Sequence, residues 1–418
     1  MNTNPNRTMR SRLRRISKRL SSRTVRRMAA VLSVPLAIAC ATAAQGSAGD
    51  ATVDGPIDRR ATPETRALFF NLRDLARTNV LFGHQDDLAY GYEWFAEPGR
   101  SDVRDASGSY PAVYGWDVAG LEKDAEKNID GVDFARMRGW IAEGYRRGGV
   151  ITISWHMDNP LTGGNAWDTT SAIAASLPGG PRHAQLVRSL DRVATFLGSL
   201  RGRGRSGGSS DTPIPVIFRP WHEMTGGWFW WGVPHTRGDE YQQLWRFTVH
   251  YLRDVKGLHN LLYAYSPNSS GPPGPRPYLD GYPGDDYVDV LGYDSYFRGE
   301  RAPANERDEL TRNLSWVVAE SEKRGKIPAF TETGLSALPD SLFWTQRLAS
   351  AIKGDSLSRR IAYVMVWRNA NRASRNDEHF YAPYRGQKSA GDFLRMKADP
   401  LFLFEDGMPD LYRGSPAR

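Results

Sequence analysis

The sequence predicts an α/β fold, a single-domain (β/α)8 TIM barrel, from three observations. Eight short apolar runs, rich in β-branched and aromatic residues, recur along the 418-residue chain. Most are separated by roughly 30 to 40 residues, which is room for one helix between successive strands. Eight such strand and helix units close a barrel, and no second shift in composition marks another domain.

The expected strands are residues 80–84, 112–116, 150–154, 215–219, 261–265, 288–292, 327–331 and 362–367. The interval between the third and the fourth run is longer than the others and contains the Arg, Gly and Ser-rich residues 201–210. We expect a solvated loop there. A polyanion-binding patch is the alternative, but this stretch has no aromatic residue to stack on a base.

The N-terminal residues have the layout of a secretory signal. The first 27 residues hold ten Lys and Arg and no acid, and the apolar residues 28–44 follow directly. We therefore expect a signal peptide at 1–44, a linker at 45–61 and one catalytic domain at 62–418, in a secreted protein. Cys40, the single cysteine, lies inside the signal, so lipid anchoring through it is the alternative localisation.

The charge of the chain is concentrated in that signal. The formal net charge is +8, but the residues after the first 27 hold 45 basic and 47 acidic side chains. This balance argues against a nucleic-acid partner, and no amphipathic membrane segment follows the signal. No metal-ligand spacing or phosphate-binding loop is present either, so we expect no metal or cofactor. We also expect the protein to be a monomer.

Unusual polar and aromatic residues follow the expected strands. Active sites of such barrels form where the strands end, and ordinary strand ends carry turn residues instead. The residues in question are His84, Gln85, Asp86, Trp116, Asp117, Trp155, His156, Arg219, His222, Glu223, Asn268, Asp294, Tyr296, Glu332, Trp367 and Arg368.

Two carboxylates among them directly follow a strand. Glu223 follows the fourth strand and Glu332 the seventh. Cleavage of a glycosidic bond needs such a pair, one to protonate the leaving oxygen and one to attack, and a separation of about 5 to 5.5 Å implies retention of configuration. A structural ion pair is the alternative for either glutamate taken alone.

Aromatic residues crowd the loop around Glu223, which favours a sugar substrate. They are Trp221, Trp228, Phe229, Trp230 and Trp231. Indole faces stack on the flat C–H faces of pyranose rings, and burial of all five on a surface loop is not expected. We expect Trp230 and Phe229 to belong to the core at the barrel mouth.

The sequence resembles glycoside hydrolase family 26, chiefly its endo-β-1,4-mannanases. RPWHEMTGGWFWWG at residues 219–232 resembles the acid/base segment of the family, and TETG at 331–334 resembles its nucleophile strand. Shorter matches cover most of the chain beyond the signal, at residues 82–85, 154–160, 289–296, 366–369 and 379–384.

The resemblance implies roles for individual residues. Glu223 would be the acid/base, held by His222, and Glu332 the nucleophile, oriented by Tyr296. His156 and Trp367 would line the subsite of the distorted sugar, and other substrate-binding residues would lie nearby: Trp228, Asp294, Arg368 and His379. Structural alternatives remain for two residues: Arg219 would only anchor the surroundings of the Glu332 carboxylate, and His379 would be an ordinary loop residue.

The expected function is endo-acting hydrolysis of β-1,4-mannosidic bonds in mannan, glucomannan or galactomannan by a retaining double displacement. Mannose specificity comes from the resemblance and not from residue spacing. Two alternatives remain at this point. One is a β-1,3-xylanase or mixed-linkage β-glucanase of the same family, and the other is a catalytically inactive barrel that binds glycans.

Overall fold

A computed structural model describes residues 54–205, 207–268, 278–299, 306–370 and 379–414, which all fall in one compact unit, Ala51–Arg418. The signal peptide that we expect at 1–44, with Cys40, lies outside the described residues. Residues 54–61, part of the expected linker, contact the barrel: the Ile57 amide donates to Asp289 at 2.8 Å, and Asp58 pairs with His259 at 2.7 Å.

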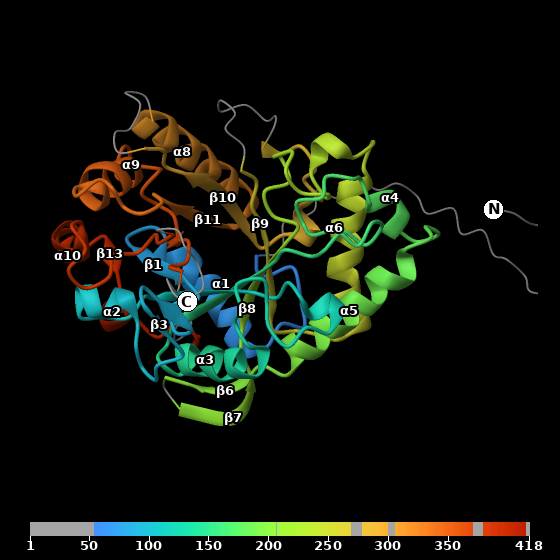
Figure 1. Cartoon of the computed structure of the whole chain (residues 1–418), viewed down its shortest axis with the longest axis horizontal. Coiled ribbons are helices and arrows are strands. Elements are labelled where there is room, and N and C mark those ends of the chain that lie inside the picture. Colours follow the sequence, from blue (N-terminus) through green and yellow to red (C-terminus); the bar gives the residue numbers. More distant parts are fainter. Residues whose placement is uncertain (1–53, 206, 269–277, 300–305, 371–378, 415–418) are drawn as a thin grey trace, which may run out of the picture. The chain divides into compact units, whose positions relative to one another are not determined.

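Eight parallel strands close a barrel, as the sequence predicts (Figure 1). Each is hydrogen-bonded to the next, and β12 returns to β1 with Leu81 opposite Tyr363. The barrel strands are β1 (Val80–Gln85), β4 (Val113–Asp117), β5 (Val150–Trp155), β8 (Val216–Pro220), β9 (Leu261–Tyr265), β10 (Val290–Tyr296), β11 (Ile327–Gly334) and β12 (Tyr363–Val366). All eight expected strands are therefore confirmed.

Helices surround the barrel. Those described are α1 (Pro63–Leu75), α2 (Asp102–Ser107), α3 (Phe134–Arg146), α4 (Ile173–Ser176), α5 (His183–Gly198), α6 (Glu240–His250), α8 (Glu306–Arg324), α9 (Ser350–Ile352) and α10 (Ala390–Ala398), with π-helical turns at Tyr251–Val255 and Phe343–Ala349. Local sequence sets where they begin. Pro63 opens α1 and the Thr62 hydroxyl caps it, while the Asp133 carboxylate caps α3. No described helix has the length and apolar character needed to cross a membrane.

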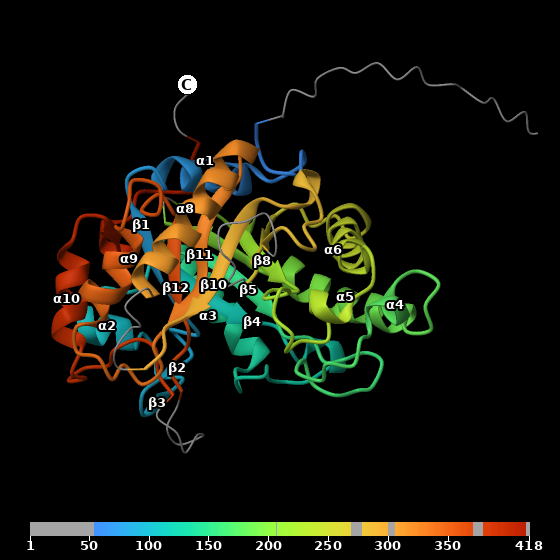
Figure 2. The same cartoon turned by 90° about the horizontal axis from the view of Figure 1, so that it is seen from above.

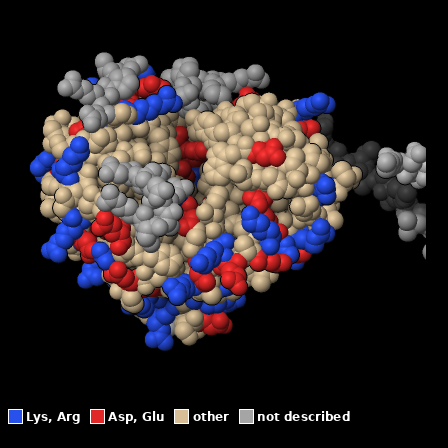
Figure 3. All heavy atoms as spheres, viewed as in Figure 1, with Lys and Arg blue, Asp and Glu red and all other residues tan. Residues whose placement is uncertain are grey.

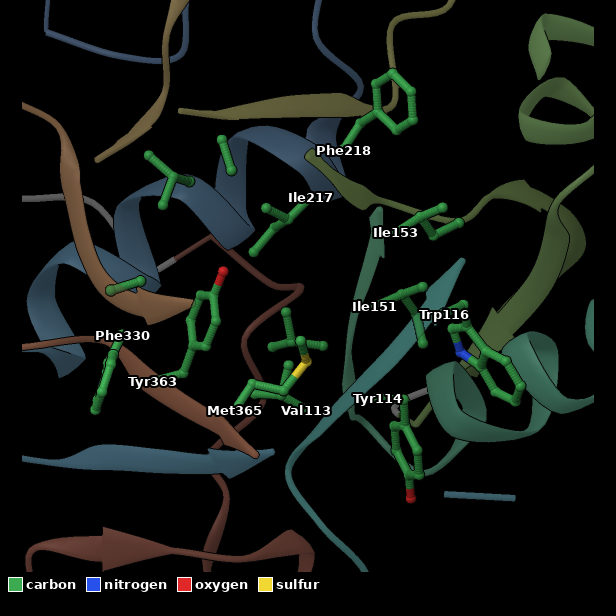
Figure 4. Close-up of a cluster of buried hydrophobic side chains, with 14 of the residues drawn as sticks. Val113, Tyr114, Trp116, Ile151, Ile153, Ile217, Phe218, Phe330, Tyr363 and Met365 are labelled. Carbon is green, nitrogen blue, oxygen red and sulfur yellow. The ribbon is translucent and has the colours of Figure 1, made fainter. Parts of the chain in front are cut away.

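The barrel interior is packed with side chains from facing strands. Val113, Tyr363 and Met365 lie together there (Figure 4). Gly83 on β1 makes room for two of them, because a Cβ at this position would lie 2.8 Å from Val113 Cβ and 3.3 Å from Met365 Cγ. The interior is thus a solid core, and only the open end is available for a site.

Two antiparallel hairpins and a short edge strand were not predicted. The pair β6 (Arg201–Gly204) and β7 (Gly207–Pro213) occupies the segment where we expected a loop, so that expectation is wrong, although most of its described residues are exposed. The pair β2 (Tyr90–Gly91) and β3 (Trp94–Phe95) follows β1 and lies at the opposite end of the barrel from α1 (Figure 2). Strand β13 (Phe402–Leu403) pairs with the start of β1.

Candidate active site

One face of the molecule is hollowed near its centre, and acidic atoms are visible in the hollow between largely uncharged surfaces (Figure 3). The two candidate catalytic glutamates lie at the barrel mouth, at the ends of two strands that β9 and β10 separate. Glu223 lies just after β8, and Glu332 lies near the end of β11. Both side chains are nearly buried.

A bulge in β11 aims Glu332. Tyr293 lies opposite Phe330 and Asp294 lies opposite Glu332, so Thr331 is one extra residue in β11. Bulges of this kind redirect the side chains that follow them. Gly292 admits the extra residue, because a Cβ there would be 2.5 Å from the Thr331 hydroxyl.

Two donors hold the Glu332 carboxylate. The Tyr296 hydroxyl donates to Oε1 at 2.6 Å, and the Arg219 guanidinium donates to Oε2. Hydrogen bonds from a phenol and a cation favour the ionised carboxylate, which is the form that attacks as a nucleophile. The structure thus contains the contacts with Tyr296 and Arg219 that these expected roles require, and the roles themselves stay predictions.

Asp294 also contacts Arg219, the cation that holds Glu332. It is fully buried, and its two oxygens accept from Arg219 at 2.6 Å, from Thr331 at 2.5 Å and from Ser266 at 3.2 Å. Burial and the nearby Glu332 charge raise the pKa of Asp294 to about 7, although Arg219 opposes that shift. We expected a sugar contact for Asp294. The structure instead gives it the role of positioning Arg219, because no part of the side chain is open to a ligand.

Glu223 lies in a strained turn. Both Trp221 and Glu223 have positive φ angles, 51° and 54°, a region that costs non-glycine residues free energy. The surroundings hold the turn in place. The Glu223 amide donates to the Ser266 carbonyl at 2.8 Å, and the Tyr241 hydroxyl donates to the Trp221 carbonyl at 2.8 Å.

Buried tryptophans pack around the same turn. Trp221, Trp230 and Trp231 are fully buried, and Phe229 is nearly so. The Trp231 indole donates to the His222 carbonyl at 2.8 Å. The expectation that Trp230 and Phe229 are core is confirmed. Not all five aromatic residues are buried, as expected, but Trp221 and Trp231 join Trp230 and Phe229 in the core, so these rings support the strained backbone and do not face a sugar.

Only Trp228 of that group is open to solvent, at 40% exposed, and it holds the Glu223 carboxyl group. Its indole N–H donates to Glu223 Oε2 at 2.8 Å. Burial raises the pKa of Glu223 well above its usual range, and the charges of Glu332 and Asp294 add to the increase. Glu223 is therefore suited to carry a proton near neutral pH, next to the carboxylate of Glu332.

His222 does not hold Glu223 as expected. Its Nε2 lies 3.1 Å from Nε2 of His156, and its own pKa is lowered well below the usual range by burial and by the charges of Arg219 and His156. Asp117, at the end of β4, contacts His156 Nδ1 at 2.7 Å. The three side chains form a buried row across the ends of β4, β5 and β8.

Asp117 controls the charge of His156. Burial would lower the pKa of this imidazole, but the charge and hydrogen bond of Asp117, followed by the charges of Glu332 and Asp130, act in the opposite direction, and the pKa of His156 is raised. We expect Asp117→Asn to lower the pKa of His156, because the substitution removes the negative charge and keeps an acceptor oxygen. NMR titration of the imidazole measures this. Asp254→Asn, at an exposed ion pair, is the matched control, and an unchanged His156 titration would contradict the assignment.

Sequence reasoning missed a second exposed tryptophan. Trp167, in the loop after β5, is 48% exposed and stacks on His156 with ring centroids 5.4 Å apart and planes at 14°. The Trp367 ring packs against the same imidazole with centroids 6.1 Å apart and ring planes at 65°. The signal was present in the sequence, since Trp167 is a lone indole in a segment of Gly, Asn, Asp and Thr. His156 and Trp367 thus come together as expected.

Arg368 and His379 are two further expected substrate-binding residues, and each has contacts of its own. Arg368 is nearly buried and pairs with Asp130 at 2.6 Å, a partner that the sequence did not suggest. The His379 and Tyr381 rings pack edge to face with their centroids 5.2 Å apart, and the Tyr381 and Tyr296 rings do so at 5.6 Å. Within the described ranges, no group of three His, Cys, Asp or Glu side chains could hold a metal ion.

Comparison with known proteins agrees with this geometry. The model of glycosyl hydrolase family 26 matches residues 57–345. A mannan endo-1,4-β-mannosidase of Bifidobacterium adolescentis is 36% identical over 352 residues, which is 80% of this chain and 34% of that protein. A mannan endo-1,4-β-mannosidase of Bacillus subtilis strain 168 is 29% identical over 63% of this chain and 71% of its own length. The chain thus spans about a third of the Bifidobacterium protein.

Solved structures are similar as well. The family 26 β-mannanase of Bacteroides ovatus superimposes with a TM-score of 0.78 at 43% identity, covering 85% of this chain and 99% of that one. An endo-β-1,4-mannanase double mutant of Cellulomonas fimi has a TM-score of 0.78 at 35% identity, covering 87% and 81%. The family model covers more than half of the chain and these identities extend over most of it, so the chain belongs to glycosyl hydrolase family 26.

Proposed function

We propose that this protein hydrolyses internal β-1,4-mannosidic bonds in mannan, glucomannan or galactomannan, with retention of configuration. The observation that carries the proposal is the contrast between two neighbouring carboxyl groups. Glu332 has a cation and a phenol as donors, whereas burial raises the pKa of Glu223 and favours its protonated form. The mannanases among the relatives support mannan as the substrate.

The reaction follows from this contrast. A Glu332 oxygen attacks the anomeric carbon while Glu223 gives its proton to the departing glycosidic oxygen, which leaves as an alcohol. Glu332 is then neutral in an ester, so one of the charges that raise the pKa of Glu223 is gone. Glu223 can now take a proton from water, which attacks the same carbon and releases Glu332. Two inversions give net retention, and no cofactor is needed.

Trp228 tunes the pH range of the first step. Its hydrogen bond favours ionised Glu223 and lowers the pKa of that group. We expect Trp228→Phe to raise the pKa of Glu223 further. Because Glu223 must be protonated to act as an acid, the alkaline limb of kcat/KM should move to higher pH. A pH profile on a manno-oligosaccharide measures this, and a limb that stays or moves to lower pH would contradict it.

Substrate assays test the function. We expect release of reducing ends from galactomannan and glucomannan, and the β-anomer as first product by proton NMR. If β-1,3-xylan or mixed-linkage β-glucan were hydrolysed faster than the mannans, that polymer and not mannan would be the substrate. Absence of hydrolysis on all four polymers, with binding retained, would favour a glycan-binding barrel instead. Release of the α-anomer would exclude the double displacement.

Export of the protein is part of the proposal. The basic residues 1–27 and the apolar residues 28–44 support a secretory signal, and a polymeric substrate requires an enzyme outside the cell. We propose that the secreted form acts as a monomer. Sedimentation of the purified protein and N-terminal sequencing of the exported chain test these two points, and a lipid on Cys40 would identify the anchored form.

A further inference from the structure

Two exposed apolar side chains lie on loops at the barrel mouth, outside the site described above. Phe95, on the hairpin after β1, is 40% exposed, and Ile129, on the loop after β4, is 45% exposed. The other large exposed apolar residues include Val255 and Leu394, which lie on outer helices. Scattered apolar residues of that kind are normal at a surface, but two on adjacent mouth loops call for an explanation.

The two loops that carry these side chains are linked through one buried ion pair. Phe95 lies opposite Tyr90 in the hairpin, and the Tyr90 hydroxyl donates to Asp86 at 2.7 Å. The charge of Arg368 acts on both Tyr90 and Asp86, so the guanidinium lies beside them. Arg368 pairs with Asp130, the neighbour of Ile129 in the chain. Tyr90, the cross-strand partner of Phe95, and Asp130, the chain neighbour of Ile129, therefore meet at Arg368 from two different loops.

The hairpin is fixed to the segment that carries Trp367. Asp102 is buried and accepts from the Trp94 indole at 2.7 Å, from the Tyr92 amide at 2.6 Å and from the Asn369 side chain at 2.7 Å. Gly91 is required for this arrangement, because a Cβ there would be 2.2 Å from the Asp102 carboxylate. The network buries Trp94 and leaves the next residue, Phe95, on the opposite, open side of the strand.

The backbone on both sides of Phe95 is strained. Glu93 and Ala96 have φ angles of 65° and 53°, in the left-handed region that non-glycine residues rarely adopt. Such strain persists only where the surroundings enforce it, and it gathers at functional sites. The hairpin, held by the Asp102 hydrogen bonds, thus presents the Phe95 ring to solvent between two residues of left-handed backbone.

The barrel order shows which half of the substrate would reach this place. Glu223 and the exposed Trp228 follow β8, and Glu223 protonates the leaving oxygen, so the departing half of the chain lies on that side. Strand β12 is four places from β8 in the closed barrel, and β1 is its neighbour. The half that stays attached to Glu332 therefore extends past Trp367 toward β12 and β1.

We propose that Phe95 and Ile129 form a platform for a distal sugar of the β-mannan chain, beyond the sugars held at Trp367 and at Arg368, on the non-reducing side of the cleaved bond. This inference rests on the function proposed above and adds a binding site to it. The Phe95 ring stacks on the C–H face of a pyranose, as aromatic rings do in glycan clefts, and Ile129 packs against its edge. The platform favours long substrates over short ones.

The test compares two substrates in Phe95→Ala. Mannohexaose can reach the platform, whereas an activated aryl β-mannobioside has only two sugars on this side. We expect kcat/KM on mannohexaose to fall about tenfold, mainly through KM, because loss of one stacked ring corresponds to about that factor. On the mannobioside the change should stay below about twofold. Ile129→Ala should show the same pattern with a smaller loss.

Matched variants complete the experiment. Leu394→Ala removes a similarly exposed apolar side chain from α10, at 47% exposed, and should leave both substrates unchanged. Phe95→Trp keeps an aromatic face and should retain the activity on mannohexaose. Equal losses on both substrates, or no loss on mannohexaose, would overturn the platform alone. A wild-type enzyme that hydrolyses neither substrate would overturn the proposed function and the platform with it.

Discussion

Glu332→Ala is expected to abolish turnover, with kcat reduced on the order of 10⁴-fold or more on mannan and on activated aryl mannosides alike. The substitution removes the oxygen that bonds to the anomeric carbon, and a better leaving group cannot replace it. Steady-state rates on both substrates measure the loss. The fold should survive, because Arg219 keeps its ion pair with Asp294 and Tyr296 remains packed against Tyr381.

Azide distinguishes this role from a structural one. With Glu332 truncated, azide can occupy the vacated space and attack the anomeric carbon once, so the product should be the α-mannosyl azide. Tyr296→Phe is the matched control, because it removes one donor to Glu332 and leaves the nucleophile in place, and its loss should be much smaller. Rescue that gives the β-azide, or a Glu332→Ala enzyme with substantial activity, would contradict the assignment.

The barrel could be predicted because its strands are buried on both faces. All six residues of β1 and all six of β5 are buried, which gives runs rich in apolar and β-branched residues that stand out in the sequence. The hairpin β6 and β7 could not be predicted in this way. Its Arg, Gly and Ser residues are mostly exposed and carry no alternation of apolar and polar residues, so its pairing leaves no signal in the sequence.

The site was predictable to the extent that strand ends determine it. Glu223, Glu332, Tyr296 and His156 gather because parallel strands end at one mouth. The depth of a side chain within that mouth was not predictable. Asp294 follows Tyr293 at the register shift with β11, and this irregularity turns it toward Arg219 rather than toward the opening.

The role of the buried tryptophans could not be predicted from the sequence either. A cluster of indoles near a catalytic glutamate fits a sugar cleft and a structural support equally well in sequence. Trp221 and Trp231 are support, because Trp221 itself has a positive φ and the Trp231 indole donates to the backbone of the strained turn. That strain is visible only in backbone angles. Trp167 was missed for the converse reason, since one indole in a polar loop forms no cluster.

Glu223→Ala should affect substrates according to their leaving groups. On mannan, kcat should fall by on the order of 10² to 10⁴-fold, because the glycosidic oxygen then leaves without a proton. With a dinitrophenyl mannoside, the first step needs no proton and should proceed nearly as in wild type. Hydrolysis of the ester then becomes slow, so a burst of dinitrophenol should precede a slow steady state. Stopped-flow absorbance measures both phases.

The pH profile and the azide product are two independent tests of Glu223 as the acid/base. Burial and the Glu332 charge raise the pKa of Glu223, so activity of the wild type on mannan should fall as pH rises through that pKa and the proton is lost. Glu223→Ala should lack this alkaline limb on the aryl substrate. Azide should now attack the ester on the face opposite Glu332 and give the β-mannosyl azide, the reverse of the Glu332→Ala product. Equal losses on both substrates, with no burst, would mean that Glu223 supports the fold of the site and does not move the proton.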